Sequence, residues 1–186
     1  TALFCFIDDH SRLIPYGEFF FEESLPRLER VLKFAILRRG IPARLYVDNG
    51  KVYVSTQLAA VCASLGIRPI HAAPFAPTSK GKIERFFGTV RSHFLPEADN
   101  AKLATLDELN ASFHAWVDLI YHRGVHSETG AAPLERFQAS IATTTLRTAD
   151  PVALRQAFLW RDKRTCLVKG QLTANDMSQY VVWTAL

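Results

Sequence analysis

The spacing of apolar and polar positions predicts strands near the start of the chain. Residues 2–7 are apolar on both faces, as in a strand buried on both sides of a sheet. Residues 13–21 follow a polar turn and are expected to form a second strand paired with the first. Pro15 removes one hydrogen-bond donor from this strand, so we expect the strand to lie near a sheet edge or to carry a bulge.

The next segments predict helices that connect further strands. Ser24 can cap a helix that Gly40 closes, and a short strand follows at residues 44–47. A helix over residues 55–65 then leads to a strand at residues 67–71. Strands and helices in this order predict an α/β sheet with helical crossovers.

A helix over residues 79–94 would have two distinct faces. Its core-facing stripe has spacings of four, three and four, and consists of Ile83, Phe87, Val90 and Phe94. The opposite face has the same spacing and consists of Lys80, Glu84, Gly88 and Arg91. Gly88 is expected to leave open space one turn beyond the carboxylate of Glu84.

The remaining part of the chain divides into a helical part and a β-like part. A capping box at residues 105–108 opens a helix whose apolar face is Leu109, Phe113, Trp116, Val117 and Ile120. A short helix is expected from Pro133. Residues 140–156, rich in Thr and Ala, read as a linker between a domain at 1–139 and a partial β-rich domain at 157–186. The latter is typical of the start of a small β-barrel.

Composition limits the class of protein but does not select a function. A chain of 186 residues that is 48% hydrophobic can bury a substantial core. The formal net charge of +4 permits a polyanionic partner without requiring one. The cysteines Cys5, Cys62 and Cys166 form no CxxC pair and are expected to be reduced core residues of a cytoplasmic protein. No membrane span or signal segment is evident, and the apolar start without Met suggests a piece of a longer protein.

Two carboxylates are candidates for metal-dependent chemistry. Asp48 follows a predicted buried strand, and ligands of open α/β sheets sit beyond the carboxyl ends of the strands. If the helix at 79–94 brings Glu84 there, the pair would bind a hard divalent cation such as Mg²⁺, as phosphoryl-transfer enzymes require. Each acid also has an ordinary explanation: Asp48 as a turn residue, and Glu84 as the partner of Lys80 on a solvated face.

Four segments resemble the DDE-type transposases and retroviral-type integrases, including bacterial insertion-sequence and Mu-like transposases. Residues 48–50 (Asp-Asn-Gly) and 80–85 (Lys-Gly-Lys-Ile-Glu-Arg) resemble the second and third acidic motifs, and the 35 residues between the two acids are typical of the superfamily. Residues 6–12 resemble the strand and turn after the first acidic motif. Residues 121–137 resemble the closing segment of bacterial insertion-sequence transposases, except that His122 stands where Asn is usual.

The resemblance implies a ribonuclease-H-like mixed sheet flanked by helices, with Asp48 and Glu84 as catalytic metal ligands for Mg²⁺ or Mn²⁺. The first catalytic Asp of the family lies in a strand that would precede Thr1, so this piece would lack its first strand and be inactive by itself. Asp8 and Asp9 are expected to structure their turn, with Ser11 and Arg12 as partners, rather than to bind metal.

The resemblance also implies a polynucleotidyl transferase acting on DNA. Two metal ions would activate water to nick the transposon end and then the freed 3′-hydroxyl to attack target DNA. The protein would assemble as a homo-oligomer on DNA in the bacterial cytoplasm. Phosphate contacts are expected from four basic residues, for which a solvated face is the alternative: Lys80, Lys82, Arg85 and Arg91.

Two other functions remain compatible with the sequence. One is a DNA-binding or assembly module with an incomplete active site, and the other is a ribonuclease-H-like nuclease that cuts without joining. His93, His122 and His126 are further candidates for DNA contact or for positioning the active site.

Overall fold

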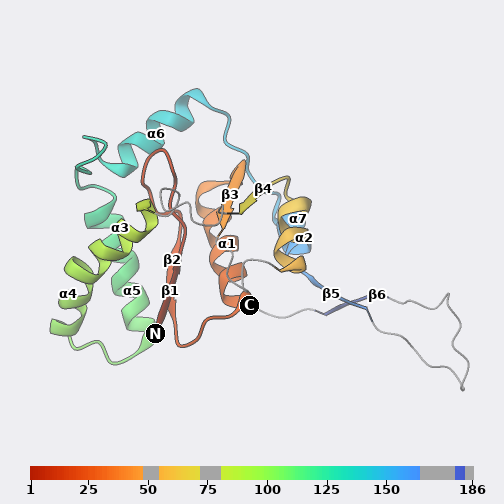
Figure 1. Ribbon diagram of the computed structural model, residues 1–186, viewed down its shortest axis with the longest axis horizontal. Coiled ribbons are helices and arrows are strands. Elements are labelled where there is room, and N and C mark those ends of the chain that lie inside the picture. Colours follow the sequence, from red (N-terminus) through yellow and green to blue (C-terminus); the bar gives the residue numbers. More distant parts are fainter. Residues whose placement is uncertain (48–54, 72–80, 164–178, 183–186) are drawn as a thin grey trace, which may run out of the picture.

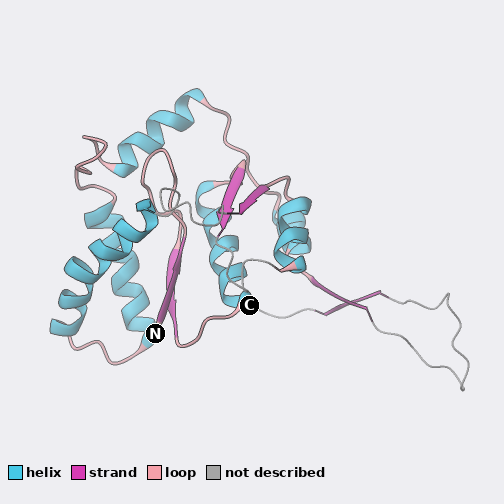
Figure 2. Ribbon diagram, in the orientation of Figure 1, coloured by secondary structure: helices cyan, strands magenta, loops and turns pink. Residues whose placement is uncertain are grey.

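The computed structural model describes residues 1–47, 55–71, 81–163 and 179–182 of the chain (Figures 1 and 2). The strands are β1 (Ala2–Cys5), β2 (Gly17–Phe20), β3 (Arg44–Val47), β4 (Arg68–His71), β5 (Trp160–Lys163) and β6 (Gln179–Val182). The helices are α1 (Leu25–Arg39), α2 (Thr56–Ser64), α3 (Gly81–Thr89), α4 (Leu95–Asn100), α5 (Leu106–Trp116), α6 (Pro133–Thr143) and α7 (Pro151–Ala157). Two π-helical segments, η2 (Val90–Phe94) and η3 (Val117–Tyr121), extend α3 and α5.

Strands β1 and β2 form an antiparallel pair that is covered on both faces. Phe4 and Phe20 point into a core beneath α1, whereas Phe19 points into a second core beneath α3 and α5. This alternation follows from the two-residue period of a strand. Gly17 is required by close packing, because a Cβ atom there would lie 2.6 Å from the Cβ of Cys5.

Strands β3 and β4 form a parallel pair with no hydrogen-bonded connection to β1 and β2 in the described part of the chain. Leu45 and Val47 are buried in the same core as Phe4 and Phe20, and α1 contributes Leu28 and its neighbours to that core. The predicted mixed α/β architecture is therefore present. The pairs β1–β2 and β3–β4 share a core with α1, whereas the pair β5–β6 extends away from the helices (Figure 2).

The helix that carries Glu84 buries Val90 and Phe94 of the predicted stripe, together with Phe86, which the prediction left out. Phe86 is 2% exposed, whereas the predicted core residues Ile83 and Phe87 are only partly buried. The core contacts run through Phe86, Val90 and Phe94, at a spacing of four. The helix also continues beyond Phe94 through α4, and the π-helical segment η2 lies at the join.

A π-helical segment explains an error in the helix predicted from the capping box at residues 105–108. The capping box of Thr105 and Glu108 is present, and Phe113, Trp116 and Val117 are buried as expected. Ile120, however, is 54% exposed. The bond from the His122 amide to the Val117 carbonyl spans five residues, which rotates later side chains relative to an ordinary α-helix.

The segment predicted as a linker contains α7. Leu154 and Ala157 are buried in the core shared by β1 and β3, and Arg147 donates to the carbonyl of Leu65 at 2.6 Å. Strands β5 and β6 form an antiparallel pair that extends away from the helices (Figure 1). The division into domains at residues 139 and 157 stays a proposal. Within the partial β-rich domain at 157–186, residues 164–178 and 183–186 lie outside the described residues.

The described residues include two of the three cysteines, and their helices can be examined for length and apolarity. Cys5 and Cys62 are free thiols, partly and fully buried, whereas Cys166 lies outside the described ranges. Among the helices in those ranges, none combines the length and apolarity needed to cross a lipid bilayer.

Side chains of α5 occupy the outer edge of β2. The amide of Asn110 accepts from the backbone N–H of Phe19 at 2.7 Å and donates to its carbonyl at 3.1 Å. The imidazole Nε2 of His114, one turn later, lies 2.7 Å from the carbonyl oxygen of Gly17. Backbone groups that a neighbouring strand would otherwise pair are thus satisfied by one helix.

We predict that Asn110→Ala lowers the free energy of unfolding by about 1–3 kcal/mol, because it leaves the buried N–H and C=O of Phe19 without partners. Denaturant unfolding of the two proteins measures the difference. Asn100→Ala, at an exposed position, is the control. A destabilisation no larger than that of the control would show that these two bonds contribute little.

Candidate active site

Glu84 lies in the first turn of α3 and is exposed to solvent. Its carboxylate makes no hydrogen bond or ion pair with any residue that the structure describes. Asp48 directly follows Val47, the buried last residue of β3, but Asp48 and Lys80 both lie outside the described residues. The separation of the two predicted metal ligands is therefore not described.

The cations on either side of Glu84 are both engaged by carboxylates. Lys82 Nζ lies 2.5 Å from Oδ1 of Asp9, and Arg85 Nη1 lies 2.7 Å from Oε2 of Glu128. Lys82 and Arg85 are three positions apart and therefore lie on the same side of the helix, so both ion pairs connect that side of α3 to the rest of the protein. The positive charges nearest Glu84 are directed towards other acids.

The face beyond Glu84 is open, as its sequence predicts. Apart from the backbone of its own helix, a Cβ atom at Gly88 would meet no atom of the described residues within 4 Å. Arg91 is exposed and makes no ion pair within the described ranges. Four basic residues are predicted to contact phosphate, and three of them lie in the described ranges. Of these three, Lys82 and Arg85 have carboxylate partners, and Arg91 has none within those ranges.

The turn after β1 is built by its own polar side chains. Oδ2 of Asp8 accepts from the backbone N–H of Ser11 at 2.8 Å and from its hydroxyl at 2.6 Å. Arg12 adopts a left-handed backbone conformation with φ of 68°. Asp8 therefore has the structural role expected from the sequence, and Asp9 is the partner of Lys82.

Arg12 connects this turn to a distant segment. Its side chain donates to the backbone carbonyl of Asp9, and its Nη2 lies 3.5 Å from Oε1 of Glu128. The hydroxyl of Tyr121 donates to the Arg12 carbonyl at 3.1 Å. Arg12 is 8% exposed, so its charge is largely withdrawn from water.

Glu128 bridges two arginines from separate parts of the chain. Its carboxylate contacts Arg12 through one oxygen and Arg85 through the other. Desolvation acts to raise the pKa of Glu128, but attraction to Arg12 and Arg85 outweighs it and lowers that pKa below its ordinary value. Sequence reasoning did not identify Glu128, because the only local signal was its place within the segment 121–137.

His122 is a buried structural residue and not a surface contact. It is 1% exposed, and its Nε2 accepts from the backbone N–H of Ile14 at 3.0 Å. Its Nδ1, which then carries the proton, lies 3.3 Å from Oδ1 of Asp118. Burial lowers the pKa of His122 to about 4 despite the attraction of Asp118, so the ring is neutral at pH 7.

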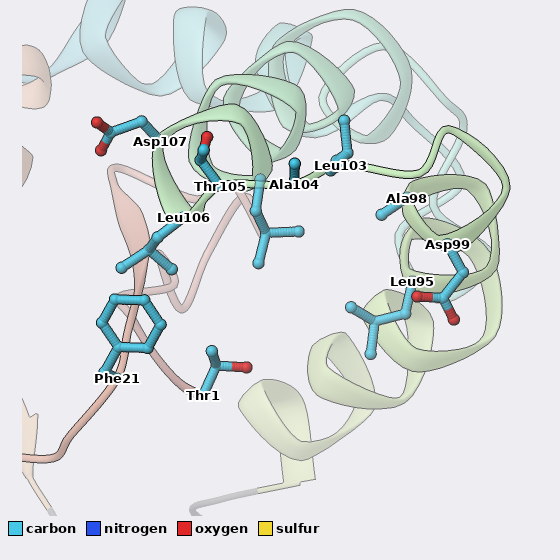
Figure 3. Close-up of a pocket in the computed structure, with 11 residues that line it drawn as sticks. Thr1, Phe21, Leu95, Ala98, Asp99, Leu103, Ala104, Thr105, Leu106 and Asp107 are labelled. Atoms are coloured by element: carbon cyan, nitrogen blue, oxygen red, sulfur yellow. The ribbon is translucent and has the colours of Figure 1, made fainter.

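No complete metal site occurs among the described residues. They contain no group of three or more His, Cys, Asp or Glu side chains placed to hold a metal ion. The pocket in Figure 3 lies between the end of β2, α4 and the start of α5, and its lining includes Phe21, Leu95 and Leu106. Glu84 and its neighbours do not line it.

Comparison with protein families and sequences points to transposases. Residues 32–100, from α1 to the end of α4, match the family model of the TnsB C-terminal domain. The chain is 26% identical over 108 residues to a putative transposase for insertion sequence element IS5376 of Geobacillus stearothermophilus, covering 53% of this chain. It is 26% identical over 109 residues to the transposase for transposon Tn552 of Staphylococcus aureus, covering 54% of this chain. These matches span 26% and 23% of the two relatives, so the chain corresponds to about a quarter of each.

Solved structures of similar fold are retroviral integrase cores. The catalytic core domain of BIV integrase matches with a TM-score of 0.62 and 20% identity, covering 76% of this chain and 88% of that one. The HTLV-2 integrase catalytic core domain in complex with magnesium matches with a TM-score of 0.58 and 18% identity, covering 73% of this chain and 83% of that one. A further match is a chain from the structure of the simian T-cell lymphotropic virus intasome in complex with the PP2A regulatory subunit B56 gamma. Its TM-score is 0.63 and its identity 25%, and the match covers 80% of this chain and 52% of that one. The ribonuclease-H-like fold expected from the sequence is therefore present.

We predict that acid destabilises this fold through His122. The folded-state pKa of about 4 lies below the ordinary value of 6.5, so the unfolded chain binds a proton first as the pH falls. Stability is then fully present above pH 6.5 and decreases towards pH 4, by about 1.4 kcal/mol for each unit of pKa difference. Denaturant unfolding between pH 7.5 and 4.5 measures this decrease.

His122→Gln is the matched variant, because Gln retains an acceptor for the Ile14 amide but does not titrate. Its stability should vary less steeply with pH than that of the unmodified protein. An equal slope in both proteins would mean that other groups cause the acid sensitivity.

Proposed function

We propose that this chain, which is similar in sequence to transposases and in fold to retroviral integrase cores, is the catalytic core of an enzyme that transposes or integrates DNA. The reaction is a phosphoryl transfer that nicks the transposon end and joins its 3′-hydroxyl to target DNA. One observation carries the proposal: Glu84 is an exposed carboxylate in the first turn of α3, and no described cation neutralises it.

Asp48 and Glu84 are the proposed metal ligands. Lys82 and Arg85 are paired with Asp9 and Glu128, which leaves the Glu84 oxygens available as hard donors of the kind that Mg²⁺ or Mn²⁺ prefers. A bound divalent ion supplies positive charge that offsets the phosphodiester and lowers the pKa of an attacking water or hydroxyl. The HTLV-2 integrase core, which shares the fold, was solved in complex with magnesium.

A third carboxylate is proposed to come from a strand outside the residues described. The pairs β1–β2 and β3–β4 share a core beneath α1, but no hydrogen bond between described residues joins them. A strand inserted between β1 and β3 would unite them in one mixed sheet and bring the first Asp beside Asp48. The antiparallel pair β5–β6 is proposed to begin a separate β-barrel-like domain from residue 157.

The proposed DNA contacts surround Glu84. Arg91 is exposed and available to a phosphate, whereas Lys82 and Arg85 would have to exchange or share their carboxylate partners. Lys80 belongs to the same proposed set. Transposon ends and target DNA are the proposed partners, bound by a homo-oligomer, in keeping with the intasome to which the fold is similar.

We predict that Asp48→Asn or Glu84→Gln, made in the full-length protein, abolishes strand transfer and leaves DNA binding intact. Each change removes a metal-binding charge but preserves the size of the side chain. Transfer of a 3′-hydroxyl oligonucleotide into target DNA measures joining, and a gel-shift titration without metal measures binding.

Glu97→Gln provides the control, since Glu97 is an exposed carboxylate farther along the same continuous helix. It should join DNA at the unmodified rate. Joining by either active-site variant would remove our assignment, and cleavage without joining by the unmodified protein would favour a nuclease.

We further predict that Lys82→Ala reduces the slope of log affinity against log salt by about 0.9, if Lys82 neutralises one phosphate of duplex DNA. Binding titrations between 50 and 200 mM salt, a range chosen from the usual sensitivity of such complexes, give this slope. Lys33→Ala, on α1, controls for the loss of one positive charge. An unchanged slope would restrict Lys82 to its ion pair with Asp9.

A further inference from the structure

The first turn of α3 is attached to the rest of the protein mainly through charged side chains. The fully buried core contact of this helix starts at Phe86, after Glu84. Ahead of Phe86, Lys82 pairs with Asp9 and Arg85 pairs with Glu128, and Ile83 is only partly buried. Ion pairs thus fix the part of the helix that carries the proposed metal ligand.

We propose that Glu128 is a positioning residue for Glu84, acting through Arg85. The inference rests on the proposed function, because it assigns Glu128 to the reaction that Glu84 serves. Glu128 does not reach the reacting atoms itself. It holds the guanidinium of Arg85, the residue next to Glu84, at 2.7 Å.

Glu128 is well suited to this role because its own turn is tightly bonded. The backbone N–H of Glu128 donates to Nδ1 of His126 at 3.3 Å, and the N–H of Gly130 donates to the His126 carbonyl at 2.8 Å. The N–H of His126 in turn donates to the carbonyl of Ala131 at 3.1 Å. These bonds fix the backbone from which the Glu128 carboxylate extends.

The second arginine gives the carboxylate a fixed reference point. Arg12 is largely buried, and its guanidinium is oriented by the carbonyl of Asp9 as well as by Glu128. The same Asp9 uses its carboxylate to hold Lys82. The turn after β1 therefore contacts α3 twice, directly through Asp9 and indirectly through Arg12 and Glu128.

The Glu128 charge is expected to affect the reaction rate much more than the stability of the fold. Arg85 and Glu128 are both exposed, and an exposed ion pair contributes little to the stability of a fold. The buried Arg12 retains the carbonyl of Asp9 as a partner, and a glutamine in place of Glu128 would still offer it an oxygen acceptor. A reacting group displaced by about 1 Å, in contrast, can slow a reaction by about 100-fold. Loss of the Glu128 charge should therefore affect the reaction far more than the fold.

The test is Glu128→Gln in the full-length protein, assayed for single-turnover strand transfer over a range of Mg²⁺ concentrations. We expect the rate to fall about tenfold or more, with more Mg²⁺ needed for half the maximal rate. The thermal unfolding midpoint should change little. DNA binding without metal should not weaken, since the variant removes a negative charge beside Arg85.

Two companion variants make the result specific. Glu135→Gln makes the same charge change at an exposed position in α6 and should leave both the rate and the Mg²⁺ dependence unaltered. Glu128→Asp keeps the charge on a shorter side chain and should recover part of the lost rate. This variant also keeps the test decisive if Glu128→Gln folds poorly.

Three results would overturn the proposal. They are an unchanged rate and Mg²⁺ dependence, a rate loss that follows a lower unfolding midpoint, and tighter DNA binding at an unchanged rate. The last would show that Glu128 only competes with DNA for Arg85. Glu84→Gln in the same assay separates this failure from failure of the proposed function, because an active Glu84→Gln protein would refute both.

Discussion

The described part of the site depends on the contact between the Arg12 guanidinium and the Glu128 carboxylate. A largely buried arginine is tolerated only where carbonyls and carboxylates replace its water, and Asp9 and Glu128 provide these groups. The contact brings together the turn after β1, the turn after η3 and the first turn of α3. Because Arg12 takes a left-handed conformation, the direction of its side chain is determined by the turn that Asp8 and Ser11 build.

The same arrangement changes the interpretation of the charges around Glu84. In the sequence, Lys82 and Arg85 read as phosphate contacts because they flank an acid of the expected motif. In the folded chain both already have carboxylate partners, so the positive charge available to a new anion is smaller than the sequence suggests. Arg91, by contrast, extends from the open face beyond Gly88.

The sequence predicted most of the fold where local rules decide it. The strand at 44–47, the capping box at Thr105 and the helix closed by Gly40 all have the expected form. The burial of Phe86 was missed because it lies at the edge of the predicted stripe, one turn before Val90. The exposure of Ile120 was missed because the π-helical segment η3 does not keep the register of an α-helix. Glu128 and Asn110 were missed for another reason. Their partners, Arg85 and Phe19, lie 43 and 91 residues away in the sequence, and the spacing of apolar and polar residues does not predict contacts over such separations.

The edge of β2 has a consequence for how copies of this protein associate. An exposed strand edge is a template on which another chain can add a strand. Here the outward carbonyl of Gly17 and both outward groups of Phe19 are occupied by His114 and Asn110, on successive turns of α5. Continuous sheets across two molecules are thereby disfavoured at β2, so an oligomer would have to form through side-chain surfaces, and aggregation by strand addition is suppressed there.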